Sequence, residues 1–145
     1  MRELPDDRQI YVSSRLWHEI HPKVNLTPFI FGLHEGIDLA KYGDGLRKFH
    51  FTFLILLPDN ELFPPGTYFD EEKQEAEIAV AIDYDDAFNA SEEELIKMME
   101  EAYLKGIELI DTLPLKSGFD TQSFREDVEA IFSQDKWYAL ITETV

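Results

Sequence analysis

The strongest constraint on the fold is residues 91–113, which carry the pattern of a long amphipathic helix. Ser91 has the side chain of an N-cap residue, and Glu94 three positions later completes a capping box. Apolar side chains then recur at three- and four-residue steps as far as Leu113, and Pro114 ends the pattern. A helix with one apolar face needs an apolar surface to cover, so we expect the preceding residues to supply a sheet.

Four earlier segments alternate apolar and polar side chains with the period of a β-strand: residues 9–17, 29–39, 48–57 and 76–85. A second helix is predicted to begin at Asp120 or Thr121. Residues 136–141 fit either a fifth strand or a final turn packed on the core. Because strands come first and helices after, the sequence predicts an α+β fold. The expected architecture is an antiparallel meander of four or five strands, with two C-terminal helices packed on one face.

Length and composition limit the class of protein. A chain of 145 residues has the usual size of one domain, so we expect residues 1–145 to form a single domain. The sequence contains no cysteine, which excludes disulfides and thiolate metal sites and agrees with a reducing cytoplasm. The first ten residues lack the pattern of a signal peptide, and no apolar run approaches the ~20 residues of a membrane span. We therefore expect a cytoplasmic protein without a membrane anchor.

The negative charge is concentrated in one part of the chain. The net charge is −17, and residues 59–111 alone carry 17 acidic and three basic side chains, whereas residues 1–58 carry seven of each. Nucleic-acid binding is disfavoured because it needs a basic surface. A basic protein partner, in contrast, would be attracted to such a field. Acidity that serves only solubility is the alternative explanation.

A run of acids follows the predicted strand at residues 76–85. Asp83 and Asp85 share one face of the strand end, and Asp86 lies on the following loop. Such carboxylates could hold a divalent cation, act as an acid–base pair, bind a partner or simply be solvated. The spacing of an EF-hand is absent. We predict a partner-binding surface with six residues: Asp83, Asp85, Asp86, Glu92, Glu93 and Glu77.

Glu92 and Glu93 also have a structural explanation, because acids near a helix N-terminus interact favourably with the helix dipole. The segment from His18 to His21 resembles a zinc motif only superficially. Its two histidines are three residues apart rather than four, and Pro22 follows at once. No metal site and no cofactor are expected.

Two further histidines suggest a different function. His34 and His50 fall on predicted strands in the polar phase, so they could face each other on an open sheet face near acidic side chains. A small enzyme or a ligand-binding domain would use these groups. No nucleophile elbow and no phosphate-binding loop accompanies them.

The segments at residues 11–16 (Tyr-Val-Ser-Ser-Arg-Leu) and 29–34 (Phe-Ile-Phe-Gly-Leu-His), followed by the helix at Ser91, resemble small immunity proteins of bacterial polymorphic-toxin systems. The resemblance implies a compact, acidic, intracellular α+β protein that binds and blocks a cognate toxin, often a nuclease. It agrees with the charge distribution, since an acidic surface could occupy a nucleic-acid-binding cleft. The first hypothesis is thus a binding protein that neutralises a basic partner, and the second is the histidine site.

Overall fold

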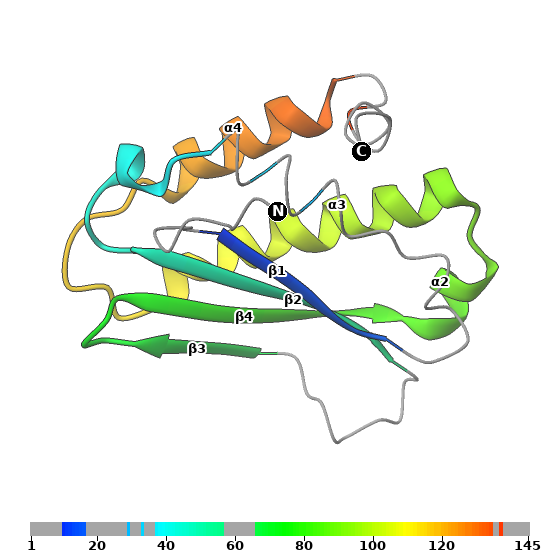
Figure 1. The fold of residues 1–145 in the computed structure, drawn as a ribbon, viewed down its shortest axis with the longest axis horizontal. Coiled ribbons are helices and arrows are strands. Elements are labelled where there is room, and N and C mark those ends of the chain that lie inside the picture. The colour runs from blue at the N-terminus through cyan, green and yellow to red at the C-terminus, as the bar shows by residue number, and fades with distance from the viewer. Residues whose placement is uncertain are drawn as a thin grey trace, which may run out of the picture.

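The structure is a computed structural model that describes residues 10–16, 29, 33, 37–56, 66–134 and 137. Helices α3 and α4 lie over one face of a sheet, which gives two layers of an α+β fold (Figure 1). The elements in chain order are β1 (Ile10–Leu16), the 3₁₀ helix η3 (Leu39–Tyr42), β2 (Lys48–Leu56), β3 (Gly66–Asp70), β4 (Glu75–Asp83), α2 (Tyr84–Asn89), α3 (Glu92–Glu108), the 3₁₀ helix η4 (Leu109–Thr112) and α4 (Thr121–Phe132).

The sheet is mixed, with the strand order β1-β2-β4-β3. Strand β2 pairs in parallel with both β1 and β4, and only β3 runs antiparallel to its neighbour β4. The predicted antiparallel meander is therefore wrong. Parallel neighbours cannot be joined by a tight hairpin. The chain must therefore cross over between β1 and β2, whereas the antiparallel strand β3 returns it between β2 and β4.

The error comes from residues 29–39, which the sequence predicts as a strand. Phe29 and Leu33 are helical, and the Ile37 amide donates to the Leu33 carbonyl at 3.0 Å, a bond of the α-helical i to i−4 type. All three side chains are buried. They are four residues apart, so the segment carried a helical period as well as an alternating one. The helical residues Phe29 and Leu33 between β1 and β2 agree with the parallel pairing of these strands, which needs a connection that returns the chain to the same end of the sheet.

The strands β1, β2 and β4 confirm three of the four predicted strands, and Gln9, Trp17 and Leu57 of the predicted ranges lie outside the described residues. In β4 the residues predicted to point inward, Ala76, Ile78, Val80 and Ile82, are buried. Residues 84–85 are not extended as expected, because they begin the short helix α2. Strand β3 was not predicted. Its first three residues are all exposed, so it lacks the alternation that reveals a strand.

Both predicted C-terminal helices are present, with the expected caps. The Glu94 amide donates to Ser91 Oγ at 3.2 Å, and the Ser91 amide donates to Glu94 Oε1 at 3.1 Å, which completes the capping box. The Ser91 amide, and then the Ser91 hydroxyl, hold the pKa of the Glu94 carboxyl below its ordinary value by hydrogen bonding. Helix α4 begins after Asp120, whose carboxylate accepts the Ser123 amide at 3.0 Å.

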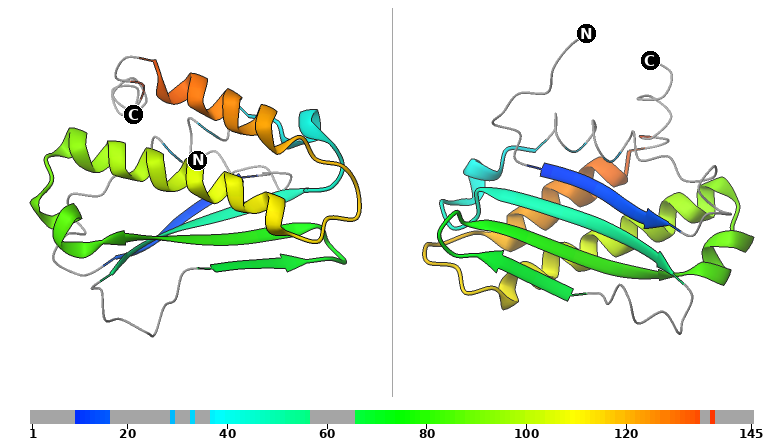
Figure 2. Two further views of the ribbon diagram at one scale, coloured as in Figure 1. Left: turned by 180° about the vertical axis from the view of Figure 1, so that it is seen from behind. Right: turned by 60° about the horizontal axis from the view of Figure 1, so that its bottom comes forward.

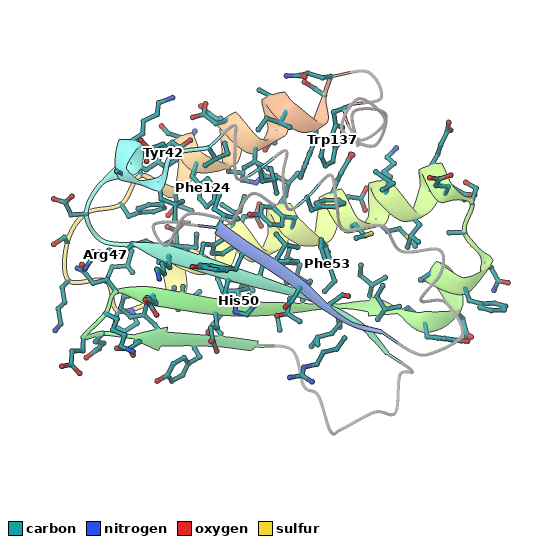
Figure 3. All side chains as sticks on the ribbon, viewed as in Figure 1. Tyr42, Arg47, His50, Phe53, Phe124 and Trp137 are labelled. Carbon is teal, nitrogen blue, oxygen red and sulfur yellow. The ribbon has the colours of Figure 1, made fainter. Side chains whose placement is uncertain are left out.

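Aromatic side chains fill the space between the two layers (Figure 3). The Tyr103 ring of α3 packs against Phe49 and Phe51 of β2, at centroid distances of 5.6 and 4.8 Å. From α4, Phe124 also contacts Phe49, at 5.6 Å. Trp137 is buried and its Nε1 donates to Glu100 Oε2 at 3.2 Å, so this residue packs on the core. The remaining residues of the segment 136–141 lie outside the described part of the chain.

Candidate functional site

Five of the six predicted partner-binding acids lie at one end of the molecule. We call this group the acidic end: Asp83, Asp85, Asp86, Glu92 and Glu93. Helix α2 and the start of α3 lie side by side at this end in both views (Figure 2), and all five residues are exposed. Asp83 also has a structural role, since its Oδ1 accepts the Asp86 amide at 3.0 Å and caps α2.

Glu77, the sixth acid, lies elsewhere. It sits on β4 six residues before Asp83, which corresponds to roughly 20 Å along a strand. Both are exposed positions of the same phase of β4, and the residues of that phase between them are Ala79 and Ala81. Glu77 is therefore joined to the acidic end by a strip of small side chains. Other acids of residues 59–111, such as Glu71, lie in the turn between β3 and β4, so the negative charge extends beyond the acidic end.

The sheet face opposite the helices carries a transverse row of four side chains, one from each strand. The register aligns Tyr11 of β1 with His50 of β2, His50 with Glu77 of β4, and Glu77 with Tyr68 of β3. Tyr68 and Glu77 are exposed, and the other two are half-buried. We call this group the transverse row.

His50 is the centre of a small hydrogen-bond network. Its Nε2 lies 3.0 Å from Ser13 Oγ, which is also 3.0 Å from Thr52 Oγ1. Its Nδ1 lies 4.0 Å from Glu77 Oε1, too far for a hydrogen bond. The order serine, histidine, carboxylate is that of a hydrolytic triad. However, Glu77 is not within hydrogen-bond distance of His50, so the three groups are not an assembled triad. The network can orient side chains for binding.

The remaining predicted ligand and metal residues divide between described and undescribed parts of the chain. His34 lies outside the described residues, as do His18 and His21, so the pairing of His34 with His50 stays a prediction. Within the described ranges, no group of three or more His, Asp or Glu side chains is arranged to hold a metal ion. None of the described helices is both long and apolar enough to cross a membrane.

Sequence reasoning missed two participants of the open face. Ser13 was assigned to a strand but given no function, and its partner His50 could be recognised only once the parallel register of β1 and β2 was known. Tyr68 was missed because β3 shows no alternation. The sequence around it offers little to mark it as a site residue: Tyr68 stands in a short segment between Gly66 and the acidic turn residues Glu71 and Glu72.

The comparison with protein families gives one result that covers most of the chain. The model of the family described as Immunity protein 44 matches residues 9–134. A comparison with curated proteins gives no match, and neither does a comparison with solved structures. The matched range includes every described strand and helix, together with the acidic end and the transverse row. The chain therefore belongs to the immunity protein 44 family, in agreement with its resemblance to the immunity proteins of polymorphic-toxin systems.

Proposed function

We propose that this protein neutralises a basic toxin by binding to it without turnover, in the cytoplasm of the bacterium that makes both. The observation that carries the proposal is the match of an immunity-protein family to residues 9–134. An immunity protein acts on a cognate toxin, and a chain with a net charge of −17 favours a partner of opposite sign.

The acidic end and the strip that leads from it to Glu77 are the proposed contact surface. The five acids of the acidic end are exposed, and among the described residues none of them forms an ion pair with a basic side chain of this chain. The side chains of Ala79 and Ala81 are short, so a partner could approach the backbone of β4 closely. If the toxin is a nuclease, this surface would compete with nucleic acid for its basic cleft.

The test uses the toxin encoded beside the gene for this protein and measures affinity by isothermal titration calorimetry. The double variant Asp85→Asn/Glu93→Gln removes two charges from the acidic end without touching the Asp83 cap. We expect about a tenfold loss of affinity, since two contact charges contribute on the order of 0.5–1 kcal/mol each.

The matched control is Glu101→Gln/Asp111→Asn, which removes the same charge from exposed positions on α3 and η4. It should leave the affinity within about twofold of the unmodified protein, because these positions lie away from the proposed contact. Equal losses in both double variants would show that net charge, and not this surface, determines binding. No binding of the toxin to the unmodified protein would contradict the proposed function.

A second candidate function is a ligand site on the open sheet face, favoured by the 3.0 Å contact between Ser13 Oγ and His50 Nε2. It contains His50 of the predicted site of His34 and His50, whose nearby acid was expected to be Glu35 or Asp83, and the structure brings Glu77 near His50. Native mass spectrometry of the purified protein would test it. A bound small molecule that is lost in His50→Ala would support this function, and a protein that is purified without any ligand would count against it.

A further inference from the structure

Tyr68 and Glu77 form an exposed pair on the outer half of the transverse row. Tyr68 is 61% exposed, which makes it the most exposed large aromatic side chain in the described part of the chain. Glu77 lies directly opposite across the antiparallel pair of β3 and β4, and its side chain is 65% exposed. Directly opposite residues of such a pair have their Cβ atoms about 5 Å apart. An aromatic face and a carboxylate are thus presented together to the outside.

On the same sheet face, one cation already contacts both an aromatic ring and a carboxylate, which come from β1 and β4 on either side of it. The Nζ of Lys48 lies 5.6 Å from the centroid of the Tyr11 ring and 3.7 Å from Glu75 Oε1. A cation is therefore held between an aromatic ring and a carboxylate by cation–π attraction and an ion pair. Tyr68 and Glu77 offer the same two groups on β3 and β4. Within the described residues no cation lies over the Tyr68 ring, and Glu77 has only His50 near it, at 4.0 Å.

We infer that Tyr68 and Glu77 form a receptor for the guanidinium group of an arginine side chain on the partner toxin. The inference rests on the proposed function for the identity of the partner and adds the chemistry of one contact. A guanidinium is planar, so it can stack on the exposed tyrosine ring while its N–H groups donate to the carboxylate. An ammonium group can contact both a ring and a carboxylate, as Lys48 does, but it has neither the flat face that stacks on a ring nor the fork of donors that matches a carboxylate, so the receptor prefers arginine to lysine.

The first arm of the test needs no toxin. Fluorescently labelled hexa-arginine and hexa-lysine carry equal charge, and fluorescence anisotropy at low salt gives the affinity of the protein for each peptide. We expect the unmodified protein to bind hexa-arginine several-fold more tightly, with Tyr68→Leu and Glu77→Gln each reducing this preference about threefold. Both residues are exposed, so neither change disturbs the core.

The controls match each variant in chemistry. Phe88→Leu changes the second exposed large aromatic residue among those described, which lies on α2, and Glu101→Gln removes one exposed charge from α3. Both controls should retain the preference for hexa-arginine. If Tyr68→Leu and Glu77→Gln behave like these controls, the inference is overturned.

The second arm repeats the variants against the toxin and includes the double variant Tyr68→Leu/Glu77→Gln. Because the two residues act on one guanidinium, the double variant should lose little more affinity than either single variant. Toxin binding that is unaffected by all three variants overturns the inference and leaves the proposed function standing. Failure of the unmodified protein to bind toxin contradicts the proposed function, and with it the assignment of the arginine to a toxin.

Discussion

At the scale of single residues, the contact between α3 and the sheet depends on the absence of a side chain at Gly106. A Cβ at this position would meet the Phe51 ring, with Cδ2 at 2.8 Å and Cε2 closer still, and Ile78 Cγ2 at 3.5 Å. Phe51 is itself fully buried between Phe53 and Tyr103, so its ring has little room to move away. The glycine therefore sets how closely the helix approaches β2 and β4.

The substitution Gly106→Ala should destabilise the protein. Overpacking a buried contact costs about 1–3 kcal/mol, and the better helix propensity of alanine offsets up to about 1 kcal/mol of this. We expect the free energy of unfolding, measured by urea denaturation, to fall by on the order of 1 kcal/mol. Gly118→Ala is the control, because nothing lies within 4 Å of a Cβ there. Equal stability of the two variants would show that the layers can separate at no cost.

The hydroxyl of Tyr42 links η3 to α4 by donating to Asp127 Oδ2 at 2.6 Å, and Lys41 Nζ lies 3.0 Å from the same oxygen. These contacts, the tyrosine hydrogen bond first, lower the pKa of the Asp127 carboxyl. Burial and the same hydrogen bond raise the pKa of Tyr42. A carboxyl whose pKa is lower in the folded state stabilises that state above the unfolded pKa, and this contribution disappears as the pH falls through the folded value.

Asp127→Asn should therefore lower the stability at pH 7 by about 1 kcal/mol, because a hydrogen bond to a charged and partly exposed acceptor is weakened. The difference from the unmodified protein should shrink as the pH falls below about 4, because the unfolded chain then takes up the proton while the folded carboxyl, whose pKa is lower, stays charged until the pH falls further. Urea denaturation at pH values from 7 to 3 measures it. Tyr42→Phe, which removes the donor, should show the same pH trend. A difference that persists unchanged at pH 3 would mean that the charge of Asp127 has no part in the link.

At the scale of elements, the sequence predicted those segments whose local signals agree with one another. Residues 91–113 combine a capping box with an apolar face and are followed by Pro114, and the structure contains α3 with that cap. Strand β4 alternates without interruption. Residues 29–39 carried two competing periods, and the sequence offered no local means to choose between them. Strand β3 carried none, because its first three residues are exposed on both faces.

The cap of α3 is the element-scale feature that is easiest to test. Ser91→Ala removes the acceptor of the Glu94 amide and should reduce the free energy of unfolding by about 1 kcal/mol. Thermal and urea denaturation followed by circular dichroism measure this loss. Glu93→Gln is a suitable control, since this residue lies in the same first turn but makes no cap hydrogen bond. If the two variants lose the same stability, the capping box contributes nothing beyond the charge of the turn.

At the scale of the whole molecule, the candidate site was predicted only in part. The number of charged residues can be read from a sequence, but their positions in space depend on how the strands and helices are arranged. The acids from Asp83 to Glu93 are close in sequence, and the structure keeps them at one end (Figure 1). Glu77 separates from them because a strand extends about 3.3 Å per residue. The alignment of Tyr11, His50, Glu77 and Tyr68 depends on the pairing of all four strands, including one that was not predicted.

A net charge of −17 should act on the free protein and on its complex in opposite directions. Repulsion between like charges opposes the compact state, and salt screens it, so sodium chloride should raise the melting temperature of the free protein. The same screening weakens attraction to a basic toxin, so the association rate should fall steeply between about 0.05 and 0.5 M salt while the dissociation rate changes little. Differential scanning calorimetry and stopped-flow fluorescence measure the two effects. If the association rate does not change with salt concentration, the partner lacks a basic surface. The proposal of a basic toxin would then be wrong, even if the protein proves to be an inhibitor.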